Sequence, residues 1–208
     1  MREILLENAI DHFGRLGFEG AATREIARAS GTAMSSITYH FGGKEGLYVA
    51  AAEHIAEGIR AFHAPVLDAA KQQAAGSREE AIEGLLAMLD NFAIMMLSDR
   101  SRGWSRFIIR EQQHPTQAFD RIFEIAMRPL IETFAQLIAT ARADLSQREA
   151  RATGFFLFGQ ALALRAARAS MCRLLDLDTV TTSDEQFLRE RLRANARAVL
   201  EMQPETSA

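Results

Sequence analysis

Residues 34–41 are predicted to form one short helix that carries several hydroxyl and ring side chains. Ile37 and Phe41 lie one helical turn apart and predict its buried side. Met34 lies at an angle between the buried and the exposed side. The polar side chains of the opposite face and its flanks are Ser35, Ser36, Thr38, Tyr39 and His40. Ser and Thr hydroxyls pair with donors or acceptors on base edges, and a Thr methyl can contact a thymine methyl, so the available chemistry is base recognition.

Groups suited to phosphate oxygens surround this helix. The predicted phosphate contacts are Thr23, Arg24, Tyr39, His40 and Lys44. Such contacts fix register and orientation and do not read sequence. The amide-rich start of the next helix, at Gly43 and Lys44, is itself suited to an anion.

The charge balance gives no support to nucleic-acid binding. The formal net charge is −3, the isoelectric point is near 6.0, and the first 48 residues carry five Lys or Arg against six acidic residues. A basic excess is the usual footprint of a nucleic-acid partner. The residue pattern alone therefore leaves two interpretations open, a DNA-contacting helix or an ordinary solvated surface.

Composition predicts an all-α chain, because 36 alanines and 21 leucines stand against four valines. In the N-terminal part, Gly17 and Gly31 mark helix ends, and Thr23 is the expected cap of the second helix. The expected helices run over residues 2–16, 23–30, 34–41 and 44–64, the last closed by Pro65. Two short helices braced by a longer first one predict a helix-turn-helix.

Beyond residue 65, three apparent capping boxes mark helix starts. They begin at Ser77, Ser146 and Ser183, each with Glu or Gln three residues later. The expected helices cover residues 78–97, 104–111, 116–143 with a kink at Pro129, 147–175 and 184–202. The prediction is about nine helices, in a helix-turn-helix head at residues 1–48 and an effector-binding and dimerisation bundle at residues 49–208.

Three motifs carry a resemblance to a known family. They are Thr-Arg-Glu-Ile-Ala at 23–27, Ala-Ser-Gly at 29–31, and Ile-Thr-Tyr-His-Phe-Gly-Gly-Lys-Glu-Gly-Leu at 37–47. With their spacing, they resemble the DNA-binding domain of TetR-family regulators, most closely the CecR-like subset. The resemblance implies a homodimeric repressor that binds a palindromic operator and is released by a small hydrophobic effector. It places groove contacts on Ser35, Ser36 and Thr38, with Met34 at their edge, and phosphate contacts on the five residues named above.

Two further sites are predicted in the bundle. Met and aromatic side chains adapt to irregular apolar guests, although the same stripe is also typical of plain core. The candidate effector pocket comprises Met88, Phe92, Met95, Trp104, Phe107, Arg110, Phe123 and Met127. A helix that is apolar nearly all round needs cover from its own domain or from a partner. The candidate dimer interface comprises Phe155, Phe158, Leu162, Leu188, Leu192 and Val199.

The sequence contains little support for other functional classes. Glu111 and His114 form one Glu-x-x-His pair, but a di-metal bundle needs a second copy, so a metal-carboxylate protein or a small-molecule carrier without DNA function is the alternative. We expect no enzyme activity, no cofactor and no metal. The lone Cys172 is expected to be packing. The single Cys, the charged N-terminus and the lack of a long apolar run favour a cytoplasmic protein without membrane contact.

Overall fold

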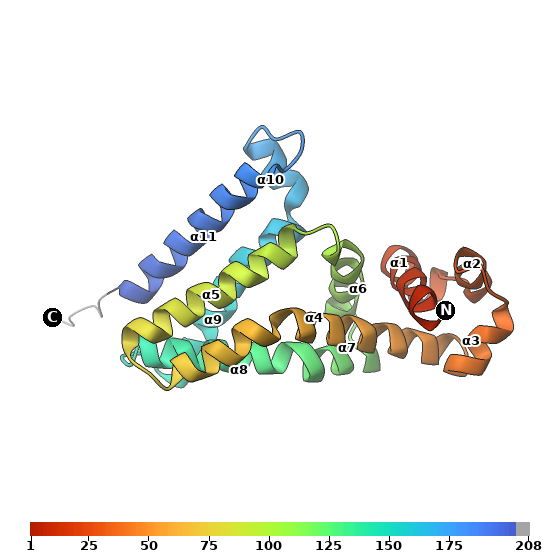
Figure 1. Ribbon diagram of the computed structural model, residues 1–208, viewed down its shortest axis with the longest axis horizontal. Helices are drawn as coiled ribbons and strands as arrows, with labels where there is room; N and C mark the ends of the chain where they lie inside the picture. The colour runs from red at the N-terminus through yellow and green to blue at the C-terminus, as the bar shows by residue number, and fades with distance from the viewer. Residues whose placement is uncertain (203–208) are drawn as a thin grey trace. The chain divides into compact units, whose positions relative to one another are not determined.

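Helices are the regular secondary structure of this computed structural model, which describes residues 1–202 (Figure 1). The all-α prediction is confirmed. Packing divides the chain into two units: unit 1 comprises residues 1–62 and 100–128, and unit 2 comprises residues 63–99 and 129 onward. This division differs from the predicted boundary after residue 48, which stays a prediction about function.

Unit 1 builds its core on the stripe predicted for the first helix. It contains α1 (Arg2–Gly20), α2 (Thr23–Ala29), α3 (Met34–Phe41), the first half of α4 (Lys44–Ala74), α6 (Ser101–Gln113), α7 (Gln117–Ile122) and the π-helical segment η1 (Phe123–Met127). Leu6, Ile10 and Phe13 are almost fully buried, and α1 packs along α6. Tyr48 lies between Phe13 and Phe107, with ring centroids 4.8 and 4.7 Å away. These contacts anchor the start of α4 to both helices.

Unit 2 is a bundle centred on α5. It contains the rest of α4, α5 (Arg78–Leu97), α8 (Arg128–Ala141, from its second residue), α9 (Gln147–Ala166), α10 (Arg168–Leu174) and α11 (Thr182–Glu201). Helices α9 and α11 both pack on α5. Phe92 of α5 stacks on Phe158 of α9 at 4.0 Å between ring centroids. Asp90 and Arg189 form an ion pair of 2.5 Å between α5 and α11.

Two of the three predicted capping boxes are confirmed. Ser77 and Ser146 each accept a hydrogen bond from the backbone of the Glu three residues later, whose carboxylate accepts one from the Ser backbone. The third box is displaced, because Thr181 caps α11 and its partner is Asp184. The Asp184 carboxylate accepts from the Thr181 backbone N–H at 2.9 Å. A carboxylate near a helix N-terminus is favoured by the helix dipole, so the helix begins at Thr182.

The predicted ends of two N-terminal helices were wrong. Thr23 is the first residue of α2 and caps nothing, because Ala22 occupies the cap position. Helix α4 does not stop at Pro65 but continues to Ala74. Proline in a helix removes one backbone hydrogen bond. The buried side chains of Leu67 and Ala70, in the next two turns, stabilise the helix beyond Pro65 despite the lost hydrogen bond.

The two longest predicted helices are each interrupted, so the chain has more helices than the expected nine. The kink expected at Pro129 is a π-helical turn just before it, where the Arg128 N–H donates to the carbonyl of Phe123, five residues earlier. The helix expected over residues 147–175 breaks at Ala167. Arg165 and Arg168, on either side of this break, donate to backbone carbonyls of Ser98 and Leu97 at the end of α5. These two contacts hold the break against α5.

Candidate nucleic-acid interface

Helices α2 and α3 form a tight helix-turn-helix around Gly31. The backbone at Gly31 has φ +64°, a left-handed conformation that favours glycine. The N–H groups of Gly31 and Thr32 donate to carbonyls of Arg28 and Ala27 and close the end of α2. The turn therefore fixes the orientation of α3 relative to α2, which a recognition helix requires.

Helix α3 has the two-sided character that the sequence predicted. Ile37 is 1% exposed, whereas Tyr39 is 85% exposed and Met34 is 54% exposed. Ser35, Thr38 and His40 are also exposed, and Ser36 is half-buried and hydrogen-bonded to Thr32 at 2.9 Å between hydroxyl oxygens. Met34, expected between the two sides, lies on the open side. Five of the polar or adaptable side chains of α3 are thus available to a partner.

The predicted phosphate contacts outside α3 have different surroundings. Arg24 is exposed at the start of α2, and its nearest carboxylate oxygen, on Glu25, is 4.0 Å away. Thr23 is half-buried beside it. Lys44 donates to the Glu19 carbonyl at 3.2 Å, and its ammonium lies 4.7 Å from the centroid of the Phe18 ring. Lys44 is therefore held by the end of α1.

An internal ion pair limits the acidic character of α2. Arg28 donates to Glu25 at 2.5 and 3.0 Å. This hydrogen bonding from Arg28 lowers the pKa of the Glu25 carboxyl, which stays ionised. Because Glu25 is paired with Arg28, one negative charge near the polar face of the head is compensated.

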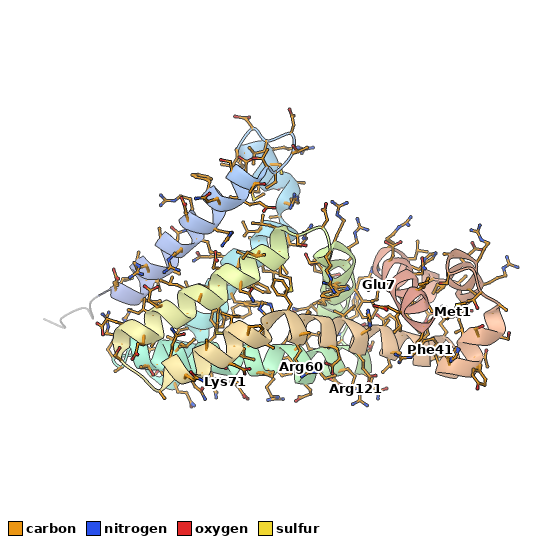
Figure 2. All side chains as sticks on the ribbon, in the orientation of Figure 1. Met1, Glu7, Phe41, Arg60, Lys71 and Arg121 are labelled. Carbon is orange, nitrogen blue, oxygen red and sulfur yellow. The ribbon has the colours of Figure 1, made fainter. Side chains whose placement is uncertain are left out.

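The joint between α3 and α4 is tight. A Cβ atom on Gly46 would lie 1.7 Å from the carbonyl oxygen of Phe41, closer than any two such atoms can approach. Gly42 ends α3 in a left-handed conformation. The Arg2 guanidinium lies 5.6 Å above the ring of Phe41, which is labelled in Figure 2. Glycine at position 46 therefore sets the distance between the reading helix and the start of α4.

Tyr48 connects α4 to the corner between α6 and α7. Its hydroxyl donates to Glu111 Oε1 at 2.6 Å, in a region where Glu111 is 2% exposed. The other carboxylate oxygen of Glu111 accepts from the backbone of Thr116 and Phe119 and from the Thr116 hydroxyl. Burial and then the hydrogen bond to Glu111 raise the pKa of the Tyr48 hydroxyl. The metal-carboxylate alternative was based on Glu111, but its carboxylate instead holds this corner through these hydrogen bonds.

A cavity of about 550 Å³ lies next to this pair, inside unit 1. Its lining comes from residues 16–19, 45, 48, 49, 110, 111, 114 and 116–118. Arg110, a predicted pocket residue, lines it and donates to the carbonyls of Gly14 and Arg15 at 3.0 and 2.9 Å. Phe18, Glu19 and Tyr48 were missed as cavity residues. No local pattern marks them, because the cavity depends on contacts between distant parts of the chain.

The remaining predicted pocket residues are distributed over both units. Met88, Phe92 and Met95 are buried in unit 2. In unit 1, Trp104 and Phe107 are buried and Phe123 and Met127 are half-buried. The Trp104 ring packs so closely on Gly58 that a Cβ there would meet it at 2.3 Å. The predicted pocket as a set stays a prediction.

The predicted dimer residues include core and surface positions. Leu188 and Leu192 are buried within the protomer, where α11 packs on α5, so they are not a free face. Phe158, Leu162 and Val199 are half-buried. Phe155 is 73% exposed, and two side chains that the prediction did not include, Phe156 and Phe187, are 69% and 50% exposed. The Phe155 and Phe156 rings are in contact, with centroids 5.9 Å apart, and adjoining exposed aromatic rings are typical of an interaction surface.

A helix-turn-helix with an exposed polar second helix, joined to a helical bundle, defines a class of DNA-binding transcription regulators. The family model "Bacterial regulatory proteins, tetR family" matches residues 5–51, and "HTH-type transcriptional dual regulator CecR, C-terminal domain" matches residues 81–202. The chain belongs to the TetR family of transcription regulators, in its CecR-like subset.

Relatives and solved structures agree with this assignment. The HTH-type transcriptional dual regulator CecR of Shigella flexneri is 32% identical over 80% of this chain and 76% of that protein. The regulator BetI of Klebsiella pneumoniae is 25% identical over 92% of this chain and 93% of that protein. A TetR-like transcriptional regulator from Rhodococcus sp. RHA1 has a TM-score of 0.69 at 18% identity, covering 97% of both chains, and shows the same fold.

Two further features of the described residues concern the alternative functions. No group of three or more His, Cys, Asp or Glu side chains comes together as a metal site within residues 1–202. No single helix in that part of the chain is long and apolar enough to cross a membrane. Helices α5 and α6 meet both criteria only when they are taken together, as a pair bent by 101°.

Proposed function

We propose that this regulator is a homodimeric repressor that binds a palindromic operator and is released by a small-molecule effector. The observation that carries the proposal is the polar, exposed face of α3, whose buried side is anchored by Ile37. Residues 1–48 would form the DNA-binding domain, and residues 49–208 the effector-binding and dimerisation domain. Such a protein would act in the cytoplasm.

Base reading is proposed for Ser35, Ser36 and Thr38, with Met34 at the edge of the contact. Single neutral hydroxyls make weaker base contacts than bidentate side chains, so each is worth the low end of about 1–3 kcal/mol. Thr23, Arg24, Tyr39, His40 and Lys44 are the proposed phosphate contacts. Loss of one phosphate contact such as Lys44 lowers the slope of log affinity against log salt by about 1 and affects all sequences alike.

Dimerisation is proposed through exposed aromatic side chains of α9 and α11, Phe155, Phe156 and Phe187, together with the half-buried Phe158, Leu162 and Val199. Two reading helices on one face of a duplex need a spacing of about 34–36 Å, which only a dimer provides. The double variant Phe155→Glu, Phe156→Glu places two charges on this surface. Light scattering should then give a mass near the 23.1 kDa of one chain in place of twice that value.

The test of the function is selection of DNA from the source genome by the immobilised protein. We expect one or a few fragments that contain inverted repeats. The variant Ser35→Ala, Thr38→Ala should lose them. Ser170→Ala, an exposed serine of α10, should retain them and serves as the matched control. Retention of the same fragments by the α3 variant would refute the assignment of the reading face.

Release by an effector is tested on the same fragments. A panel of small apolar and amphipathic compounds is added to the preformed complex. Coupling free energies of allosteric proteins are typically about 1–3 kcal/mol, so an effector should weaken operator binding about 5- to 150-fold. A compound that binds the protein tightly and leaves operator affinity unchanged is not the effector, and a panel of binders that all behave so would contradict release.

A further inference from the structure

The cavity of unit 1 has an apolar interior. Leu16 and Phe18 come from the end of α1, Tyr48 and Val49 from the start of α4, and Ala118 from α7. Its volume of about 550 Å³ is within the range of small-molecule sites, about 300–1,000 Å³. These walls would accept the apolar body of a ligand and exclude water from it.

Three carboxylates contribute to the polar lining of this cavity. Glu19, Glu45 and Glu111 line it, against one permanent cation, Arg110. Arg110 is engaged with two backbone carbonyls of α1, and Glu111 is engaged with Tyr48 and the α6–α7 corner. Glu19 and Glu45 are exposed at the rim. When the Lys44 ammonium beside Glu19 is counted as well, three carboxylates stand against two cations, so a charged ligand meets a net negative charge at the entrance.

An ammonium group of the chain itself already occupies the aromatic edge of the cavity. Lys44 Nζ lies 4.7 Å from the centroid of the Phe18 ring and donates to the Glu19 carbonyl. An ammonium over an aromatic face is attracted by the negative face of the ring. The ring and the carbonyl together thus form a position that accepts a cation.

We propose that this cavity binds a lipophilic organic cation, which acts as the effector of the regulator, so that part of the effector site lies within residues 1–48, the proposed DNA-binding domain. The ammonium would lie near Phe18 between Glu19 and Glu45, and the apolar part would contact Leu16, Val49 and Tyr48. An anionic ligand would instead place its charge beside two rim carboxylates. This inference rests on the proposed function for its regulatory consequence, but ligand binding itself does not require DNA.

Occupation of the cavity acts on the reading head directly. The bound cation takes the place of Lys44 at the Phe18 ring, which by itself frees Lys44 for phosphate, so the loss of operator affinity comes from the backbone around the cavity. The ligand also contacts the end of α1 after Gly17, where the backbone leaves the helical conformation (φ +76°), and the first turns of α4. These segments position α3 through the tight joint at Gly46. A bound ligand that moves them therefore lowers the affinity of the protein for its operator.

The test is calorimetric titration of the full-length protein, without DNA, with octyltrimethylammonium, 1-octanol and octanoate. These probes share an eight-carbon chain and differ in charge. We expect one cation per chain, bound more tightly than the alcohol, with octanoate weakest. The variant Glu19→Gln, Glu45→Gln should weaken binding of the cation about tenfold, since each exposed charge contributes a few-fold, and leave binding of octanol unchanged. Glu3→Gln, an exposed carboxylate of α1 away from the cavity, is the matched control.

Equal affinities for the three probes, or unchanged cation affinity in the double variant, would overturn the proposal. Absence of cation binding in a protein that still binds its operator would overturn this inference and leave the proposed function intact. Cation binding that depends on Glu19 and Glu45, in a protein that selects no genomic DNA, would support the site and contradict the proposed function. Operator release by octyltrimethylammonium, lost in the double variant, would support both.

Discussion

His63 makes the stability of unit 2 depend on pH. This side chain of α4 is 2% exposed, accepts a hydrogen bond from Asn91 Nδ2 at 2.9 Å and lies beside the Phe92 ring. Burial lowers the pKa of His63 from 6.5 to about 4. The folded state therefore holds a neutral imidazole at pH values where the unfolded chain binds a proton.

The sign and size of the effect follow from proton linkage. A lowered pKa in the folded state means that stability is fully present above the unfolded pKa of 6.5 and is lost as the pH falls towards the folded value of about 4. At about pH 5, nearly all unfolded chains and about a tenth of folded chains carry the proton. Integration from about pH 7.5 to about pH 5 gives a loss of about 2 kcal/mol in the free energy of unfolding.

Urea denaturation followed by circular dichroism across this pH range measures the loss, at one fixed protein concentration. The variant His63→Asn retains an acceptor for Asn91 but cannot titrate. Its stability is lower at all pH values, because the smaller side chain leaves a void, but about 2 kcal/mol of the pH dependence should disappear. His114→Asn, which removes an exposed histidine, is the matched control and should retain that dependence. The same pH dependence in wild type and His63→Asn would refute the reasoning.

Three further perturbations test the packing of the head and of the bundle. Gly46→Ala should destabilise the protein by more than about 2 kcal/mol in thermal melts, because its Cβ would overlap the Phe41 carbonyl oxygen. Gly103→Ala, whose Cβ would have its nearest neighbour at 3.6 Å, is the control and should melt close to wild type. Equal melting temperatures of the two variants would contradict the tight joint. Tyr48→Phe should cost about 1.5–3 kcal/mol in urea denaturation, because a buried carboxylate loses one donor, and a cost near zero would mean that the 2.6 Å contact contributes nothing. Ser77→Ala should cost about 1 kcal/mol, because it removes the cap of α5, and recovery in Ser77→Asp would show that the cap and not the surroundings is responsible.

The elements that the sequence predicted well depend on local signals. Helix α3 has its predicted limits, Met34–Phe41, because Gly42 ends it in a left-handed conformation that few other residues adopt. Of the two residues predicted on its buried side, Ile37 is buried and Phe41 is half-buried. The boxes at Ser77 and Ser146 likewise act within four residues of chain. Each of these features is decided by neighbours in sequence.

The features that were missed depend on contacts between distant residues. Helix α4 continues past Pro65 because later residues are buried, which the local penalty of proline does not reveal. The cavity beside Tyr48 depends on a hydrogen bond between residues 63 positions apart. Leu188 and Leu192 have the same apolar stripe whether they face α5 or a second chain, so periodicity could not decide between them. Tertiary packing, and not residue type, determines these positions.

Base recognition by the exposed side of α3 is the central claim. Its most direct test is the anisotropy of a labelled operator duplex and of a scrambled duplex, titrated with wild type and with Ser35→Ala, Thr38→Ala at one salt concentration. The account predicts that the variant loses operator affinity by at least about tenfold and retains its affinity for the scrambled duplex, because phosphate contacts are intact. Unchanged operator affinity in the folded variant would contradict it.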